Sequence, residues 1–437
     1  MILSAYLLLA PLLQAQPAQR SLPADVLNLA QIRRNVQASA MQVPDYACLE
    51  TIERYGRTSP KRPFRHIDTL QLEVGMIGNK EVYSWPGAET FEAVSPGEIV
   101  SAGMVSTGEF MQLLRAVFVG GTSVITWRGE EELNGRRVLR YDYTLPLYGY
   151  RSRVNISGAA GDVSLRGSFW AGAETLELMR LESQANEIPP TLPLAAMVSR
   201  IDYGKMTVHG RSIWFPQSAE LMLVEMSGQE TRNRIEFSHC RQYAGSSTLS
   251  FDDPRTDGPS PAPRAIERLE LPAGMTLELR LESGIESSTS GVGQTITARL
   301  ASDAVYKKKV LIPAGALVKG RVRRLERSSE LTPHFVVGLE FSTIENDNLR
   351  ARFYGLLHSV QPVAGLSTAL RTSSSKSTRY PSTSAMQGFR VEAGSSETLY
   401  FRELPGVGTF FMSGTQFRLP RGFRMTWQTV ALPKSGR

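Results

Sequence analysis

Residues 271–322 read LPAGMTLELRLESGIESSTSGVGQTITARLASDAVYKKKVLIPAGALVKGRV, and the outline of this stretch returns near the C-terminus. A proline and a glycine precede an alternating run three times, at LPAG 271–274, IPAG 312–315 and LPRG 419–422. Because proline fixes its own φ and glycine tolerates positive φ, each tetrapeptide predicts a tight turn that leads into a strand. The strands expected after these turns span residues 275–281, 316–322 and 423–429. The stretch contains no catalytic pattern.

The order of these features resembles the small β-barrel of the TrbI-like channel proteins of bacterial conjugation systems, and stand-alone envelope domains of the same shape. The matching features are the xPAG turn, a strand, a Ser/Thr-rich turn, the pattern GQxxxAxLASD, the IPAG turn and the final GRV. The resemblance covers residues 269–358, with 405–430 as a closing strand. It implies that the second half of the chain forms a small β-barrel.

Length and charge divide the chain into two parts. With 437 residues, of which 41% are hydrophobic and 21% charged, it is long enough for two domains with separate cores. Its 37 glycines and 25 prolines favour many short strands and turns. Residues 261–437 contain 24 Lys and Arg against 14 Asp and Glu, a net charge of +10, whereas residues 1–260 contain 25 against 28, a net charge of −3.

The N-terminal segment has the pattern of a signal peptide. Residues 2–13, ILSAYLLLAPLL, form an apolar run that is too short to span a bilayer, and Leu13-Gln14-Ala15 is a plausible cleavage site. We therefore expect residues 1–20 to be a signal peptide and the protein to be periplasmic or otherwise exported to the cell envelope.

The two cysteines, Cys48 and Cys240, fit that compartment. In an oxidising compartment an isolated pair forms a disulfide, whereas a reducing cytosol leaves two core thiols. The sequence favours the disulfide. In the entropy model such a long loop would stabilise the fold by roughly 4 to 5 kcal/mol.

The first domain is expected over residues 21–250. Pro23 predicts the first turn of a helix, and the capping box of Ser106 and Glu109 predicts a second helix over 106–119. The strands expected from alternation span 46–54, 67–76, 81–85, 123–128, 136–144, 150–157, 162–170, 175–185, 198–208, 212–226 and 231–242. The predicted fold class is therefore α+β and mainly β: an antiparallel half-barrel with two covering helices, followed by a small β-barrel or sandwich.

Two segments of this domain resemble the lipoprotein-carrier fold of LolA, LolB and the RseB-type envelope regulators. They are SFWAGAETLELMRLESQA at 168–185 and IDYGKMTVHGRSIWFPQSAEL at 201–221. The resemblance implies a hydrophobic concavity that holds an acyl chain or an apolar peptide. The side chains expected to line it are Trp85, Phe110, Leu114, Trp127, Trp170 and Trp214. Ordinary core packing is the alternative explanation for these tryptophans.

The second domain, residues 265–437, is expected to present a basic surface. Its candidate residues are Lys307, Lys308, Lys309, Arg321, Arg323 and Arg324. Protection of strand edges and solubility explain such residues simply. Attraction to an anionic membrane or to an acidic cell wall is the sharper alternative. Nucleic acid is not expected as a partner, because the basic residues lack interleaved aromatics.

Two further segments lack the pattern of a packed core. Residues 251–264 are expected to be a Pro-rich linker between the domains, and the Ser/Thr-rich residues 366–384 a disordered insertion in the second domain.

No catalytic residue, metal site or cofactor is expected. The five histidines are scattered, and the sequence contains no nucleophile elbow, P-loop or HExxH motif. The function expected is therefore non-enzymatic binding of a lipid, a lipoprotein acyl chain or an apolar peptide. The alternatives are an assembly component of an envelope complex that acts through its second domain, and a cell-wall or lipid hydrolase. The sequence leaves the oligomeric state open.

Overall fold

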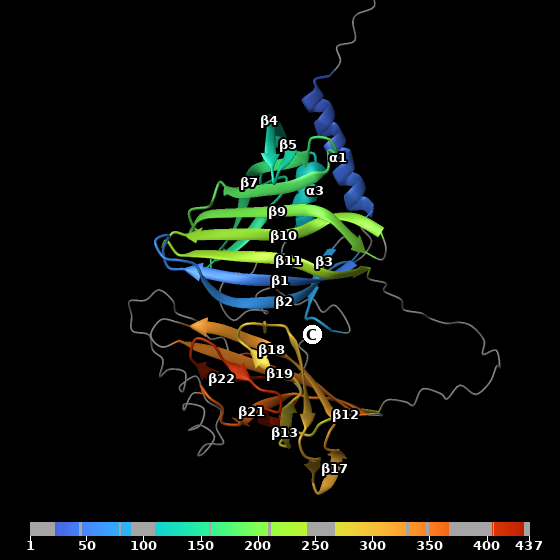
Figure 1. Ribbon diagram of the computed structural model, residues 1–437, viewed down its shortest axis with the longest axis vertical. Coiled ribbons are helices and arrows are strands. Elements are labelled where there is room, and N and C mark those ends of the chain that lie inside the picture. The colour runs from blue at the N-terminus through green and yellow to red at the C-terminus, as the bar shows by residue number, and fades with distance from the viewer. Residues whose placement is uncertain are drawn as a thin grey trace, which may run out of the picture.

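The computed structural model describes residues 22–42, 46–77, 80–88, 110–156, 159–208, 211–242, 267–328, 333–346, 349–366, 404 and 406–431. The described residues form a first lobe (22–242) and a second lobe (267–431), both mainly β (Figure 1). The expected fold class is thereby confirmed. The expected signal peptide, the capping box at Ser106, the linker and all of the insertion except Leu366 lie outside the described residues.

The first lobe is built on one curled sheet of eleven strands (Figure 1). Its strands are β1 Tyr46–Arg57, β2 Arg65–Ile77, β3 Lys80–Ser84, β4 Val124–Leu133, β5 Arg136–Leu145, β6 Ser152–Ile156, β7 Ala159–Gly172, β8 Leu178–Asn186, β9 Leu194–Val208, β10 Arg211–Glu225 and β11 Glu230–Gln242. The order along the sheet is β3-β2-β1-β11-β10-β9-β8-β7-β5-β4, and β6 pairs with β7. The structure confirms the long antiparallel run predicted from the sequence. Strand β1 pairs with its neighbour in sequence, β2, and also with the last strand, β11.

Two helices among the described residues cover one face of this sheet (Figure 1). Helix α1, Ala24–Gln42, follows Pro23, whose carbonyl accepts hydrogen bonds from the backbone N–H of Val26 and Leu27. Helix α3, Phe110–Phe118, ends where the N–H of Gly120 bonds to the carbonyl of Arg115.

The second lobe contains a nine-stranded sheet and two small two-stranded sheets. The large sheet comprises β12 Glu267–Glu270, β13 Thr276–Leu281, β15 Thr295–Leu300, β18 Leu317–Ser328, β19 His334–Asn346, β20 Leu349–Arg352, β21 Gly355–Val360, β22 Val407–Ser413 and β24 Arg424–Thr429. The small sheets pair β14 Ile285–Glu286 with β23 Arg418–Leu419, and β16 Ala304–Tyr306 with β17 Lys309–Ile312. Trp427 is fully buried at the centre, where its ring contacts the rings of Phe341 and Phe353.

The lobes meet where β2 faces β18 (Figure 1). Strand β3 pairs with β2 only from Glu73 onward, which leaves the earlier half of that edge open. Val292 of the second lobe fills it: its carbonyl accepts from the N–H of Gln71 and its N–H donates to the carbonyl of Thr69, both at 2.7 Å. A backbone edge that would otherwise be exposed is thus paired across the lobes.

Candidate ligand-binding site

The concave face of the first sheet is apolar, and α3 occupies it. The side chains of α3 that are buried there are Met111, Leu113, Leu114, Ala116, Val117 and Phe118. Phe118 packs edge-on against Phe169 of β7, with 4.9 Å between ring centroids. Because these side chains are part of the core of the lobe, α3 is a fixed part of the half-barrel.

A small apolar pocket remains between α1, α3 and strands β8 to β10. Its volume is about 10 Å³, which is room for about one water molecule. The residues that line it are Val36, Ser39, Met111, Leu114, Leu178, Tyr203, Trp214 and Pro216. Two of the side chains predicted to line a cavity, Leu114 and Trp214, therefore do meet in one pocket. The Trp214 ring is fixed there, because its Nε1 donates to the carbonyl of Leu178 at 2.6 Å.

Trp127 lies farther along the same face. Its ring packs edge-on against Tyr141, with 4.9 Å between centroids, and Tyr141 stacks on Phe169 at 5.1 Å. The Tyr141 hydroxyl donates to the carbonyl of Asp25 in α1 at 2.8 Å. Burial raises the pKa of Tyr141 to about 12, so this hydroxyl stays a donor that holds α1 on the sheet.

Trp170 lies on the opposite, convex face, because it alternates with Phe169, which packs against α3. Its Nε1 donates to Glu131 at 2.9 Å, and the Arg140 guanidinium lies 5.5 Å from its ring centroid. The hydrogen bonds from Trp170 and Arg140 lower the pKa of the Glu131 carboxyl. Trp170 is therefore part of a polar cluster and does not line the concave face, contrary to the expectation.

Trp85 is not at the concave face either, and it comes directly after β3. The guanidinium groups of Arg321 and Arg323 lie 5.4 and 4.9 Å from its ring centroid, so Trp85 joins the two lobes by cation–π contacts. The sixth predicted residue, Phe110, has a side chain outside the described part of the structure.

The predicted basic surface is divided by the structure. Arg323 pairs with Glu340 at 2.8 Å, and Arg324 is only 2% exposed, with two hydrogen bonds to Glu326 at 2.9 and 3.0 Å. Arg321 and Arg323 contact Trp85 of the first lobe, whereas Arg324 is buried beside Glu326 of its own strand, so none of the three belongs to an open basic surface. Only Lys307, Lys308 and Lys309 are exposed.

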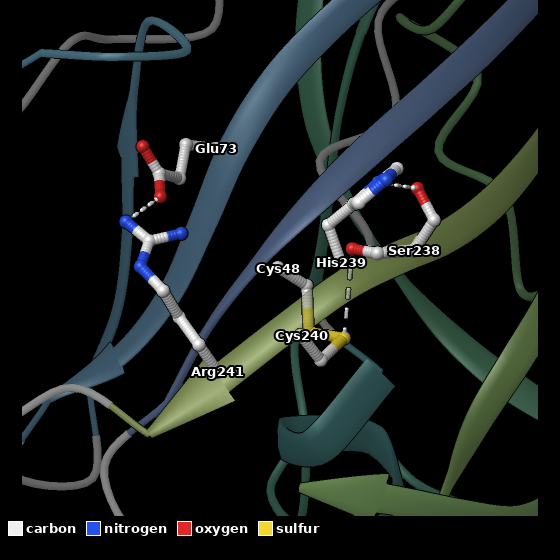
Figure 2. Close-up of a disulfide and its surroundings, with 6 residues drawn as sticks. All are labelled: Cys48, Glu73, Ser238, His239, Cys240 and Arg241. Atoms are coloured by element: carbon white, nitrogen blue, oxygen red, sulfur yellow. Dashed lines mark hydrogen bonds and ion pairs between the residues drawn. A yellow bond between two sulfur atoms is a disulfide. The ribbon is translucent and has the colours of Figure 1, made fainter. Parts of the chain in front are cut away.

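Figure 2 shows the predicted disulfide, with Cys48 of β1 bonded to Cys240 of β11. Their Cα atoms are 4.0 Å apart, within the roughly 7 Å that a disulfide allows. The strand register shifts beside the bond, and His239 has a positive φ of 51°, which is typical of a β-bulge. Arg241 forms an ion pair with Glu73 of β2 next to it (Figure 2). The bond therefore fastens the first strand of the lobe to the last.

No group of three or more His, Cys, Asp or Glu side chains in the described ranges is arranged to hold a metal ion. In the same ranges, no helix has the length and the apolar character needed to cross a membrane.

No protein-family model matches the chain, and no curated protein matches it. Solved structures that align with it include a DUF1329 family protein from Desulfovibrio piger, at 14% identity over 52% of this chain and 97% of that one, with a TM-score of 0.28. A Vibrio parahaemolyticus protein described as an outer membrane lipoprotein-sorting domain aligns at 11% identity over 51% of this chain and 95% of that one, with a TM-score of 0.27. Both scores are too low for these likenesses to assign a function to this chain.

Proposed function

We propose that this protein is an exported, non-enzymatic envelope protein whose first lobe binds an apolar ligand: a lipid, a lipoprotein acyl chain or an apolar peptide. The ligand would lie against the concave face of the eleven-stranded sheet, in contact with Leu114 and Trp214. The observation that carries the proposal is the difference between the two helices on that face, since α3 is part of the core whereas α1 buries only two of its described side chains.

Helix α1 is held by few buried side chains and by hydrogen bonds of Asp25, Asn35 and Gln37 to the rest of the lobe. Of the side chains described for it, only Ile32 and Val36 are buried, while Val26 and Leu27 are 43% and 51% exposed. Burial of two aliphatic side chains stabilises the docked helix by roughly 3 to 6 kcal/mol. An element with so few buried contacts opens more readily than the core around it.

The pocket beneath α1 is too small for any acyl chain while the helix is docked, since ligand pockets commonly measure about 300 to 1,000 Å³. Binding would therefore require α1 to move aside. A chain of about a dozen carbons gains roughly 9 kcal/mol when it is buried, at about 0.8 kcal/mol per CH₂. That gain is larger than the burial of Ile32 and Val36 alone, and it must also offset the hydrogen bonds that hold α1 and the immobilisation of the ligand.

Export and the absence of catalysis are parts of the same proposal. The disulfide between Cys48 and Cys240 supports an oxidising compartment. The acids and bases whose pKa values shift near the sheet, such as Glu131 and Tyr141, are used in hydrogen bonds that hold the fold.

The test is titration of the full-length protein with lauric acid, followed by tryptophan fluorescence. We expect tryptophan fluorescence to change with a midpoint at a micromolar concentration of lauric acid. Trp214→Phe should remove this change, whereas Trp170→Phe, on the convex face, should retain it. Leu114→Asp should abolish binding, whereas Gln112→Asp, an exposed position of α3 that receives the same charge, should not.

A second pair of variants tests whether α1 moves aside when the ligand binds. Ile32→Ala and Val36→Ala loosen α1 and should tighten binding, because a larger fraction of molecules is then open to the ligand. If neither the wild type nor these variants bind lauric acid or an apolar peptide below the millimolar range, the proposal fails and the assembly role remains.

A further inference from the structure

The hairpin formed by β16 and β17 stands apart from the sheets of the second lobe. Among the described strands, these two pair only with each other. Figure 1 places the hairpin at the end of the second lobe that lies away from the first lobe. Ala304 and Ile312 at its base are buried, whereas the residues between them are exposed or half-buried.

The turn of this hairpin has a backbone that its residues do not favour. Lys307 and Lys308 have φ values of 48° and 68°. Positive φ at both positions of a two-residue loop is the pattern of a type I′ turn, for which Asn-Gly is strongly preferred. Side chains such as lysine rarely adopt this region, and their presence there is unfavourable by local strain. Stability of the hairpin therefore does not explain two lysines at its tip.

In the described part of the chain, no carboxylate pairs with the charges at the tip. Within the described residues, Lys307, Lys308 and Lys309 form no ion pair, although the Lys307 ammonium lies 5.3 Å from the ring centroid of Tyr306. All three side chains are exposed. The tip is thus a concentrated positive charge that faces solvent.

An exposed apolar pair lies directly behind this charge. Val305 and Val310 are opposite each other in the register of the hairpin, so they lie on the same face. They are 47% and 48% exposed. A cationic tip followed by an exposed pair of branched aliphatic side chains has the composition of an element that meets a lipid interface.

We propose that the hairpin of residues 304–312 docks this protein on the surface of an anionic lipid bilayer. The three ammonium groups would pair with headgroup phosphates, while Val305 and Val310 reach the boundary between headgroups and acyl chains. An acidic polymer would engage the lysines but would leave the valine pair in water, which is why the bilayer is the better partner. This docking goes beyond ligand binding by the first lobe and does not depend on it.

The test is sedimentation of the full-length protein with vesicles of phosphatidylcholine alone or mixed with phosphatidylglycerol. The wild type should bind the mixed vesicles only, and less tightly as salt increases. Lys307→Asn combined with Lys308→Gly installs the preferred turn residues while it removes two charges, so the fold is kept and binding should weaken about 30-fold, at about 1 kcal/mol per lysine. Val305→Thr combined with Val310→Thr should weaken it about tenfold.

The matched control is Arg136→Gln combined with Arg151→Gln, two exposed arginines of the first lobe, which should bind as the wild type does. Equal weakening in this control would show that net charge alone drives binding and would overturn the proposal. Wild-type binding by the valine variant, together with competition by soluble polyglutamate, would assign the hairpin to an acidic polymer and overturn it as well.

Discussion

Arg54 and Asp68 form a buried ion pair beside the contact between the lobes. Nε and Nη2 of Arg54 donate to the two carboxylate oxygens of Asp68 at 2.6 and 2.5 Å, and both side chains are about as buried as the core, at 3% and 2% exposure. Burial disfavours the charged guanidinium, but Asp68 and Glu326 of the second lobe raise the pKa of Arg54 above its ordinary value. Glu326 itself pairs with Arg324. Two pairs of opposite charges, Arg54–Asp68 in the first lobe and Arg324–Glu326 in the second, thus stabilise each other at the contact between the lobes.

We predict that Asp68→Asn lowers the free energy of unfolding by about 3 to 5 kcal/mol, because it leaves the Arg54 charge buried without its partner. Glu130→Gln is the matched control, since Glu130 pairs with Arg137 at the surface and such pairs contribute only about 0 to 1 kcal/mol. Urea denaturation of both variants measures the difference. Equal losses would mean that the buried pair contributes no more to the free energy of unfolding than the surface pair does.

His66, two residues before Asp68, makes stability depend on pH. Burial lowers its pKa from 6.5, and the nearby charges of Arg327 and Arg54 lower it further, against the opposite effects of Asp68 and Glu53. In the range just below pH 6.5 the unfolded chain therefore binds more protons than the folded one, so stability is present above that pH and is lost as the pH falls.

The expected result is a melting temperature that decreases below pH 6.5 in the wild type and decreases less in His66→Gln. His358→Gln, at an exposed histidine of the second lobe, provides the control. A profile that His66→Gln does not flatten would show that other groups cause the acid sensitivity.

Single residues were predictable where one rule decides them. The pairing of Cys48 with Cys240 followed from a count of two cysteines and a compartment. The positions of Arg324 and Trp170 did not follow, because alternation defines two faces of a strand but not what each face meets. That information depends on strands distant in sequence, such as β2 for β18 and β4 for β7.

The turns that open β13, β18 and β24 show how local chemistry determines an element. Gly274, Gly315 and Gly422 all have positive φ, at 87°, 83° and 86°, as the three PxG tetrapeptides predict. A Cβ at any of them would meet no atom within 4 Å. Gly293 is different: its φ is 94° and a Cβ there would lie 2.0 Å from the carbonyl oxygen of Gln71.

Substitution by alanine should therefore lower the free energy of unfolding by different amounts at these two kinds of glycine. Gly315→Ala should lower the free energy of unfolding by about 1 kcal/mol, since only the backbone conformation is disfavoured. Gly293→Ala should cost more, because the turn must also withdraw from β2 and break the hydrogen bonds between Val292 and that strand. Thermal melts of the two variants compare them, and a Gly293→Ala loss no larger than that of Gly315→Ala would contradict the close approach seen here.

Element types were predictable for the same reason that these turns were. Alternation and turn residues located the strands of the first lobe to within a few residues, and the apolar stripe located α3. The pairing of β1 with β11 and of β2 with residue 292 was not predictable, because any strand edge offers the same backbone groups. The candidate pocket was predictable in part: Leu114 and Trp214 meet there, but the filling of the half-barrel by α1 and α3 depends on how two helices dock.

The two lobes act on each other through residues 292–294, which bridge two sheets. Val292 pairs with β2 of the first lobe, while Gly293 and Gln294 exchange hydrogen bonds with Val322 of β18, at 2.7 and 2.9 Å. Leu70 and Val292 belong to one connected cluster of buried apolar residues that extends into both lobes. The relative placement of the apolar pocket and the lysine hairpin is therefore determined by backbone pairing and not by a chain connection alone.

This bridge gives the division into two domains a sharp test. Fragments of residues 21–250 and 264–437 should each melt cooperatively, because each contains its own sheet and buried side chains. The first fragment should melt at a lower temperature than in the intact chain, since the open half of β2 then loses its partner. Mixing the fragments should restore part of that stability, and Gly293→Ala in the second fragment should prevent the restoration. If either fragment alone is molten, the cluster that contains Leu70 and Val292 works as one core, and the boundary expected at residues 251–264 does not separate two folding units.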